Sequence, residues 1–353
     1  MAKVINGTSI PNIPWEDRPA NCKDVCWRSS LNPILTRDDI EDANSLFNSS
    51  VIAYKGEFRG IFRCDKTDML PLLHKGKSKD GINWEIEDEP LKFENEIEGQ
   101  RYEYGYDPRI CELEGKYYII WCRNAGNGNW DPTLGMAWTE DFETIHLMEN
   151  PFLPYNRNGS LFPRKINGYY VMLSRPMAPN LPTVGSIHAS KSKDLEFWGH
   201  HRFVMGPKGG WQSCKIGSGP TPIETDEGWL LIYHGVKKTC NGLCYYAGAA
   251  ILDLEDPIKV LYRSKKYILS PRELYECVGD VPNVVFPCAA LCDKDTGRIT
   301  IYYGAADTVV GIAFTTVDEL IKFTKENSMV LARSKTFLLN GNVVSSMLTV
   351  PIM

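Results

Sequence analysis

The 353-residue sequence contains no long hydrophobic run. No stretch approaches the roughly 20 consecutive apolar residues that a transmembrane helix needs. The first residues, MAKVINGTSIPNIPWEDRP, also lack the basic start and apolar stretch of a secretory signal. We therefore expect a cytoplasmic protein without a membrane-spanning helix.

An excess of basic residues is also missing. The chain has 39 Lys and Arg against 44 Asp and Glu, which gives a formal net charge of -5. Proteins that bind nucleic acid or anionic membranes usually carry a basic patch, and this balance gives no sign of one. The expected partner is a small molecule, with no nucleic acid and no membrane.

The cysteines do not form the pattern of a disulfide framework or a zinc site. There are 11 of them, an odd number, and they are scattered over expected strands such as those of Cys122 and Cys288. In a chain without an export signal, this pattern favours reduced thiols in a core. Cys240 and Cys244 are too isolated to hold zinc, so we expect no metal and no cofactor.

A unit of strand, turn and strand recurs five times along the chain. Each unit has a glycine turn before a run of β-branched and aromatic residues, and a second run that ends in an acidic turn. Units of about 50 to 70 residues with several strands are typical of propeller blades. We predict an all-β fold, a five-bladed β-propeller, with a β-sandwich or jelly roll as the alternative. The predicted turn glycines are Gly56, Gly115, Gly168, Gly228 and Gly297.

One closed ring of blades would use most of the chain. We expect an N-terminal extension (residues 1–45), a propeller catalytic domain (46–330) and a C-terminal tail (331–353). Thr36 could cap a short helix in the extension. The extension would strap the ring or contact another subunit, and the tail is apolar, so a homo-oligomer is expected.

Polar residues at strand ends of a propeller point toward the mouth of the central channel, where ligands bind. The segment LFNSSVIAYKGEFRGIFRCD places four such residues there, with a solvated strand end as the alternative interpretation. They are Asn48, Ser49, Arg63 and Asp65.

The tetrapeptide Tyr106-Asp107-Pro108-Arg109 stands directly before a predicted blade strand. An Asp before Pro is usually only a turn former. Here an aromatic residue precedes Asp107 and a guanidinium follows it, which offers a sugar platform and a charge that could tune the carboxyl. Asp107 is therefore the candidate catalytic acid.

Basic residues recur in two consecutive predicted blades, at similar distances from the blade turns. Radial geometry could bring them to one side of the channel, where they would suit a dianion such as phosphate. The alternative is four unrelated surface cations. These residues are Arg157, Arg175, Lys215 and His234.

Several pieces of the chain together resemble glycoside hydrolase family 130, the five-bladed β-mannoside phosphorylases. They run from about residue 30 to 325 and include LFNSSVI, GIFRCD, YDPRI, NRNGSLFPRKING, KIGSGPTPIETDEGWLLIYHGV and YYGAADTVVGIAF. Within the family, NRNGSLFPRKING and YECVGDVPNVVFPCAAL are most similar to the 4-O-β-D-mannosyl-D-glucose phosphorylases.

The resemblance implies roles for individual residues. Asp107 would be the proton donor, and the proton would pass through the 3-hydroxyl of the mannose. Inorganic phosphate would be the co-substrate, held by the four basic residues named above. Glu276 would be a further carboxylate at the site. The implied mannose contacts are Asn48, Ser49, Arg63, Asp65, Tyr106, Tyr245, Phe286 and Asp307.

The implied reaction is inverting phosphorolysis of 4-O-β-D-mannosyl-D-glucose to α-D-mannose 1-phosphate and D-glucose. Phosphate is already an anionic nucleophile, so one acid and a cationic cradle suffice. An alternative acceptor is a β-1,4-manno-oligosaccharide or N-acetylglucosamine, and Trp130 in the loop 126–133 could stack on it. Two other classes stay open: a hydrolase in which Glu276 or Asp307 activates water, and a non-catalytic glycan-binding propeller.

Overall fold

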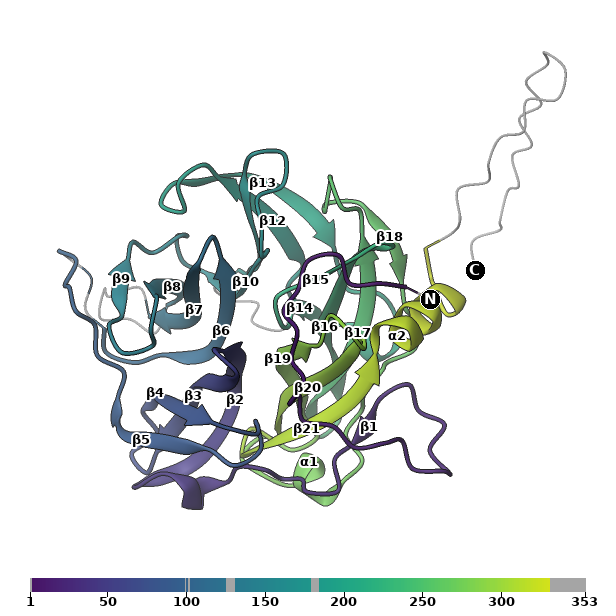
Figure 1. Cartoon of the computed structure of the whole chain (residues 1–353), viewed down its shortest axis with the longest axis horizontal. Helices are drawn as coiled ribbons and strands as arrows, with labels where there is room; N and C mark the ends of the chain where they lie inside the picture. Colours follow the sequence, from purple (N-terminus) through teal and green to yellow (C-terminus); the bar gives the residue numbers. More distant parts are fainter. Residues whose placement is uncertain (1, 99, 101, 125–130, 179–183, 331–353) are drawn as a thin grey trace, which may run out of the picture.

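The computed structural model describes residues 2–98, 100, 102–124, 131–178 and 184–330. Within these residues, five antiparallel sheets surround one axis, as Figure 1 shows. Each sheet is a blade of four strands, and the fourth blade carries one additional short strand. The prediction of a five-bladed β-propeller is confirmed, and the sandwich alternative is wrong.

The strands of the first three blades follow one another in sequence, from the innermost to the outermost. Blade I contains β2 (Ala43–Tyr54), β3 (Glu57–Lys66), β4 (Pro71–Ser78) and β5 (Glu85–Pro90). Blade II contains β6 (Tyr106–Leu113), β7 (Lys116–Asn124), β8 (Pro132–Thr139) and β9 (His146–Met148). Blade III contains β10 (Asn156–Leu161), β11 (Tyr170–Pro176), β12 (Ile187–Ser192) and β13 (Trp198–Met205).

The last two blades depart slightly from this scheme. Blade IV contains β14 (Lys215–Ser218), β15 (Ile223–Thr225), β16 (Gly228–Thr239), β17 (Gly242–Leu252) and β18 (Val260–Arg263). Blade V contains β19 (Val285–Cys292), β20 (Arg298–Ala305) and β21 (Val309–Thr316), and its outermost strand is β1 (Trp27–Arg28). The described residues also contain four helices: η1 (Arg37–Asp39), η2 (Gly210–Gln212), α1 (Leu274–Cys277) and α2 (Val317–Glu326).

The predicted turn glycines all adopt the backbone conformation that requires them. Gly56, Gly115 and Gly168 have φ of 83°, 80° and 73°, and the residue before each also has positive φ. Two successive residues with positive φ are the mark of the tight hairpin turn that matches strand twist. Gly228 and Gly297 also have positive φ. The repeat in the sequence is thus the repeat of blade hairpins.

The acidic turns of the repeat are also present. In blade I the carboxylate of Asp80 accepts hydrogen bonds from the backbone amides of Ile82 and Asn83, both at 2.8 Å. Asp141 and Asp194 make the same pair of bonds in blades II and III. An aspartate that satisfies the amides of its own turn favours this reversal in each blade.

The N-terminal segment closes the ring. Trp27 of β1 pairs with Phe314 of β21, so the beginning of the chain completes the last blade. In Figure 1 this segment (purple) runs across one face of the propeller. Thr36 caps η1 with a hydrogen bond to the Asp38 amide, as predicted. No helix in the described part of the chain is both long and apolar enough to span a membrane.

Apolar packing between neighbouring blades fixes the inner strands around the axis. Ile61 and Leu73 of blade I share one buried cluster with Ile119, Trp121 and Ala137 of blade II. Corresponding clusters join the other blades. Because such interiors are closely packed, the side chains at the ends of the inner strands are held in fixed relative positions.

Candidate active site

Three consecutive blades carry an Asn or Asp at the same place on the inner strand. Asn48, Asp107 and Asn158 have φ of 42°, 52° and 57°. Each lies where the pairing of inner strand and second strand shifts register. Asn and Asp tolerate positive φ better than other non-glycine residues, and a bulge redirects a side chain. The irregularity is therefore how the fold turns these side chains out of the sheet.

Asp107 is held by two donors from blade I. Its Oδ1 accepts from Asn48 Nδ2 at 2.8 Å and from Arg63 Nη1 at 2.9 Å. Arg63 uses its other donors in a bidentate pair with Asp65, at 2.7 and 2.8 Å. A Cβ atom on Gly304 would lie 1.8 Å from Asn48 Oδ1, so blade V also fixes this position. The structure thus brings together four of the predicted residues.

The carboxyl groups of this cluster have different pKa values. Burial alone raises the pKa of Asp107, but the charges of Arg63 and Arg109 and the Asn48 amide outweigh it and hold the pKa below its usual value. Burial raises the pKa of Asp307 to about 7 against the opposing charge of Arg63, and the charges of Asp107 and Asp65 add to the rise. In the free site Asp107 is therefore ionised, whereas Asp307 titrates near neutral pH.

Tyr106 connects the acidic cluster with the basic one. The Arg63 guanidinium lies 5.3 Å from the centre of its ring, and the Arg157 guanidinium lies 5.6 Å from the same ring. Burial lowers the pKa of Arg157, but nearby groups including Tyr106 and Asp107 outweigh it and the pKa lies above its usual value. Arg157 thus stays charged beside the catalytic candidate.

His234, the fourth member of the predicted basic cluster, is uncharged in the free site. His234 is completely buried, and its Nε2 lies 2.9 Å from Arg175 Nη1. A guanidinium can only donate, so Nε2 accepts and the ring is neutral. Burial, followed by the charges of Arg175, Arg109 and Lys215, holds the pKa of His234 well below its usual value. His234 orients Arg175 instead of adding a fourth cation.

The cations of this cluster repel one another in the free site. Burial, followed by the charges of Arg175 and Arg157, lowers the pKa of Lys215 to about 7. Burial lowers the pKa of Arg175 to about 10. The Nε atoms of Arg157 and Arg175 are buried without a hydrogen-bond partner. Buried like charges with unused donors are an arrangement that a bound dianion would stabilise.

Anion binding by this cluster should depend on the charge of Lys215. Because its pKa is about 7, Lys215 is charged below that pH and neutral above it. We expect sulfate affinity to fall by about ten- to hundredfold as pH rises well above 7, as one charge-assisted bond is lost. Calorimetric titration with sulfate checks this. Lys215→Arg should keep its affinity at high pH, and a pH-independent wild type would contradict the prediction.

Two of the predicted aromatic residues lie against the basic cluster. The ring of Phe286 packs on His234 at 4.4 Å between centroids, and Tyr245 lies 6.2 Å from both rings. Lys215 Nζ is 5.5 Å from the Tyr245 ring. Ser49 differs, because its hydroxyl donates to the Phe47 carbonyl at 3.0 Å and joins neither cluster.

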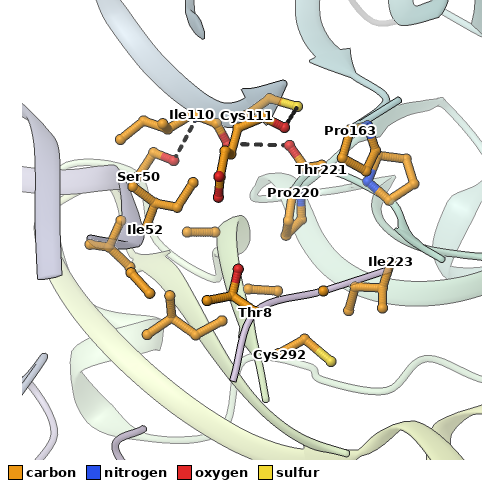
Figure 2. Close-up of a pocket in the computed structure, with 18 of the residues that line it drawn as sticks. Thr8, Ser50, Ile52, Ile110, Cys111, Pro163, Pro220, Thr221, Ile223 and Cys292 are labelled. Atoms are coloured by element: carbon orange, nitrogen blue, oxygen red, sulfur yellow. Dashed lines mark hydrogen bonds between the residues drawn. The ribbon is translucent and has the colours of Figure 1, made fainter. Parts of the chain in front are cut away.

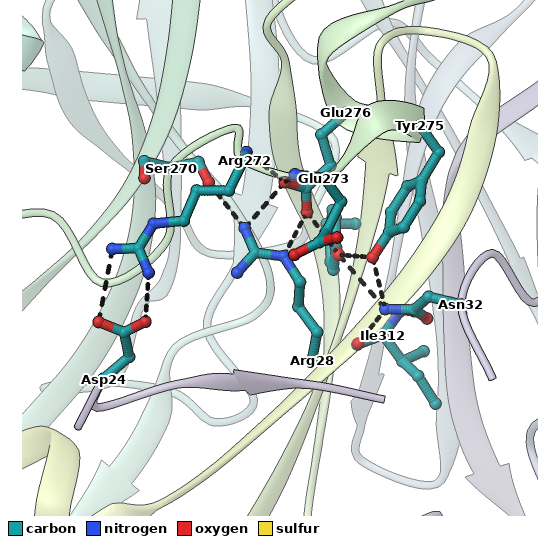
Figure 3. A network of polar contacts seen from close by, with 10 residues as sticks. Asp24, Arg28, Asn32, Ser270, Arg272, Glu273, Tyr275, Glu276 and Ile312 are labelled. Atoms are coloured by element: carbon teal, nitrogen blue, oxygen red, sulfur yellow. Dashed lines mark hydrogen bonds and ion pairs between the residues drawn. The ribbon is translucent and has the colours of Figure 1, made fainter. Parts of the chain in front are cut away.

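Glu276 belongs to a separate polar network, shown in Figure 3. Its two carboxylate oxygens pair with Arg28 at 2.7 and 2.8 Å, and Oε1 also accepts from the Tyr303 hydroxyl at 2.8 Å. Oε2 accepts from the backbone amides of Arg272 and Glu273. Because these partners occupy a completely buried carboxylate, Glu276 is poorly suited to touch sugar or activate water.

Sequence reasoning gave the Arg109 guanidinium only the role of tuning the Asp107 carboxyl, and it did not assign Asn158 to the site. Arg109 is buried and donates to the carbonyls of Asp107 and Gly219 at 2.6 and 3.1 Å. The Oδ1 atom of Asn158 is buried without a hydrogen-bond partner. It lies near His234, because a Cβ atom on Gly217 would be 2.8 Å from both Asn158 Oδ1 and His234 Nε2. The recurrence of Asn or Asp in FNSS, YDPR and RNGS was the signal for Asn158. The predicted acceptor platform, Trp130, lies outside the described residues.

A cavity of about 360 Å³ lies at the other end of the inner strands, shown in Figure 2. It is lined by the N-terminal segment at Thr8 and by Ser50, Ile110, Thr221 and Cys292. None of the predicted site residues lines it. Within the described ranges, no group of three or more His, Cys, Asp or Glu is placed to hold a metal ion.

The fold and site define a five-bladed propeller with an ionised carboxyl group beside a cluster of basic residues. The model of glycoside hydrolase family 130, described as beta-1,4-mannooligosaccharide phosphorylase, matches residues 8–326. The chain therefore belongs to glycoside hydrolase family 130, as the sequence pieces indicated, and it is an enzyme of the glycosyl-transferring phosphorylase class.

Individual relatives differ in their similarity to this chain. A beta-1,4-mannooligosaccharide phosphorylase from Ruminococcus albus is 53% identical over 93% of this chain and 99% of its own length. A 4-O-beta-D-mannosyl-D-glucose phosphorylase from Bacteroides fragilis is 26% identical over 85% of this chain and 80% of its own. The structure of a beta-1,2-mannobiose phosphorylase from Listeria innocua, with beta-1,2-mannobiose, has a TM-score of 0.76 at 26% identity. The match covers 85% of this chain and 99% of the Listeria innocua chain.

Proposed function

We propose that this enzyme catalyses inverting phosphorolysis of β-1,4-mannooligosaccharides and releases α-D-mannose 1-phosphate. The observation that carries the proposal is the group of Arg157, Arg175 and Lys215, of which Arg175 and Lys215 are buried and Arg157 is partly buried. This group adjoins Asp107 through Tyr106. A cluster of this kind positions an anionic nucleophile. An acid next to it can assist departure of the leaving sugar.

The residues divide the work by blade. Arg157 and Arg175 of blade III and Lys215 of blade IV hold phosphate, and His234 fixes the orientation of Arg175 through the contact of 2.9 Å. Asp65 and Asp307 accept hydrogen bonds from mannose hydroxyls, and Arg63 orients Asp65 and Asp107. Tyr106 and Phe286 provide aromatic faces for the sugar. Phosphate then attacks the anomeric carbon, and the bond to the leaving sugar breaks.

Asp107 must gain a proton before it can donate one. Its pKa in the free site lies below the usual value. A general acid needs the opposite, a pKa raised toward the pH at which the enzyme works. Arrival of a phosphate dianion offsets the positive charge that keeps Asp107 ionised. A bound mannose would also exclude water, and both changes raise the pKa. Asp107 therefore becomes a proton donor when both substrates are present, and passes the proton through the mannose 3-hydroxyl.

Hydrolysis is the weaker alternative because neither candidate base among the described residues, Glu276 or Asp307, is both unpaired and fully ionised. Both oxygens of Glu276 are occupied by Arg28 and other donors. The pKa of Asp307 is raised to about 7, so this carboxyl is partly protonated at neutral pH. An inverting hydrolase needs an ionised carboxylate opposite the acid.

The expected cytoplasmic location and the expected homo-oligomeric assembly remain predictions.

The proposed class of acceptor rests on how similar the chain is to two relatives with different acceptors in their names. The mannooligosaccharide phosphorylase is 53% identical to this chain, and the mannosylglucose phosphorylase is 26% identical. This favours the alternative acceptor over glucose, the acceptor expected first from the sequence. We expect kcat/KM for synthesis from α-mannose 1-phosphate to be higher with mannose or mannobiose as acceptor than with glucose or N-acetylglucosamine. A preference for glucose would return the protein to the mannosylglucose phosphorylases.

A further inference from the structure

Inversion places the leaving sugar on the side of the mannose opposite the phosphate. The basic residues come from β10 and β11 of blade III and from β14 and β16 of blade IV. In a ring of five blades, the opposite side is blade I, which has blades II and V as neighbours. Blade V carries Asp307, which we place against mannose, so the relevant pair is blade I and blade V. These two blades meet where the Leu46 amide donates to the Thr308 carbonyl at 3.0 Å. The acceptor should therefore lie near this junction.

One loop forms the surface at the junction. We name residues 278–283, between α1 and β19, the rim loop. Its Asp280 accepts from Asn44 Nδ2 of blade I at 2.7 Å, and the Asp280 amide donates to Thr308 Oγ1 at 2.8 Å. The Val281 amide donates to the Ala306 carbonyl at 3.1 Å, next to Asp307. The rim loop is thus seated beside the carboxylate that we place against mannose.

The exposed side chains of the rim loop have the composition of a sugar subsite. Val278 is 64% exposed and Val281 is 37% exposed, although both belong to a hydrogen-bonded loop. Asp280 lies between them with its carboxylate already paired to the Asn44 amide. Apolar surface with a few fixed polar groups is typical of small-ligand sites. The valines can pack on the apolar face of a sugar ring, and Asp280 and Asn44 can bond its hydroxyls.

The Glu276 network holds the rim loop in place. Glu276 caps α1 and accepts from Arg28 of β1, as Figure 3 shows. The Glu276 carbonyl accepts from the Val284 amide at 3.0 Å, so the same residue fixes both ends of the loop. A Cβ atom on Gly279 would lie 2.3 Å from Thr308 Oγ1, which shows how closely the loop packs. A surface held this firmly loses little conformational freedom on binding.

We propose that the rim loop and Asn44 form the acceptor subsite, with Asp280 bonding the leaving sugar and Glu276 acting as a positioning residue. This inference rests on the proposed function. It assigns acceptor recognition to the junction of blades V and I, and it gives the N-terminal strand β1 a part in the site through Arg28.

The test uses the synthetic direction, in which donor and acceptor have separate KM values. With α-mannose 1-phosphate and mannobiose, we expect Asp280→Ala to raise the KM of mannobiose about ten- to hundredfold. The KM of α-mannose 1-phosphate should stay unchanged. Asp256→Ala, which removes an aspartate from the turn after β17, serves as the matched control and should leave both values unchanged.

The possible results distinguish failure of the proposed function from failure of the proposed acceptor subsite. A wild type that makes no mannoside from α-mannose 1-phosphate overturns the proposed function itself. A working wild type with an Asp280→Ala variant that changes neither KM, or both equally, overturns the subsite alone. Glu276→Gln should reproduce the selective rise in acceptor KM if the network positions the loop. An equal change in both KM values would reduce Glu276 to general stability, and the Asp280 result decides the subsite if this variant fails to fold.

Discussion

Replacing Asp107 with asparagine should lower kcat by a factor of about a hundred to ten thousand. The amide keeps the size of the carboxyl and can still accept from Asn48 Nδ2 and Arg63 Nη1, which lie 2.8 and 2.9 Å from Oδ1. It cannot supply a proton to the leaving sugar. The loss should therefore appear in the chemical step, measured as turnover of mannotriose at saturating phosphate.

Binding provides the control for this variant. Mannooligosaccharide affinity of Asp107→Asn should be close to that of the wild type, because Asp65 and Asp307 keep their hydrogen-bonding groups. Loss of the negative charge should leave sulfate binding equal or slightly stronger, since fewer anions surround the basic cluster. Near-normal turnover in Asp107→Asn would mean that Asp107 is only a turn former before Pro108.

The repeat architecture could be predicted because it depends on local chemistry. Gly56, Gly115 and Gly168 each follow a residue with positive φ, and no other residue suits these turns as well. Asp80 and its counterparts satisfy the amides of their own turns. Such features act over a few residues, so single-sequence reading finds them.

The roles of Glu276 and His234 could not be predicted because they depend on distant packing. Arg28 and Glu276 are 248 residues apart, and only the closure of blade V by β1 brings them together. The neutral state of His234 comes from complete burial and from Arg175, Arg109 and Lys215 around it. Neither a partner nor a buried environment can be read from the residue type.

The second large effect concerns phosphate as the nucleophile. Without phosphate, we expect cleavage of mannotriose to fall to the background rate, because the basic cluster then holds no nucleophile. Arg175→Ala should weaken the use of phosphate by about ten- to hundredfold, as it removes one charge-assisted bond. This variant also frees His234 Nε2, which lies 2.9 Å from the Arg175 guanidinium. Residual activity of Arg175→Ala should recover at high phosphate concentration, whereas that of Asp107→Asn should not.

The central claim is that the buried cations hold the nucleophile. Initial rates on mannotriose at zero and at saturating phosphate, with quantification of both α-mannose 1-phosphate and free mannose, test it most directly. The account predicts cleavage only with phosphate, and all of the released terminal sugar as α-mannose 1-phosphate. Equal rates with free mannose as the product would contradict it, and would mean that water is the nucleophile.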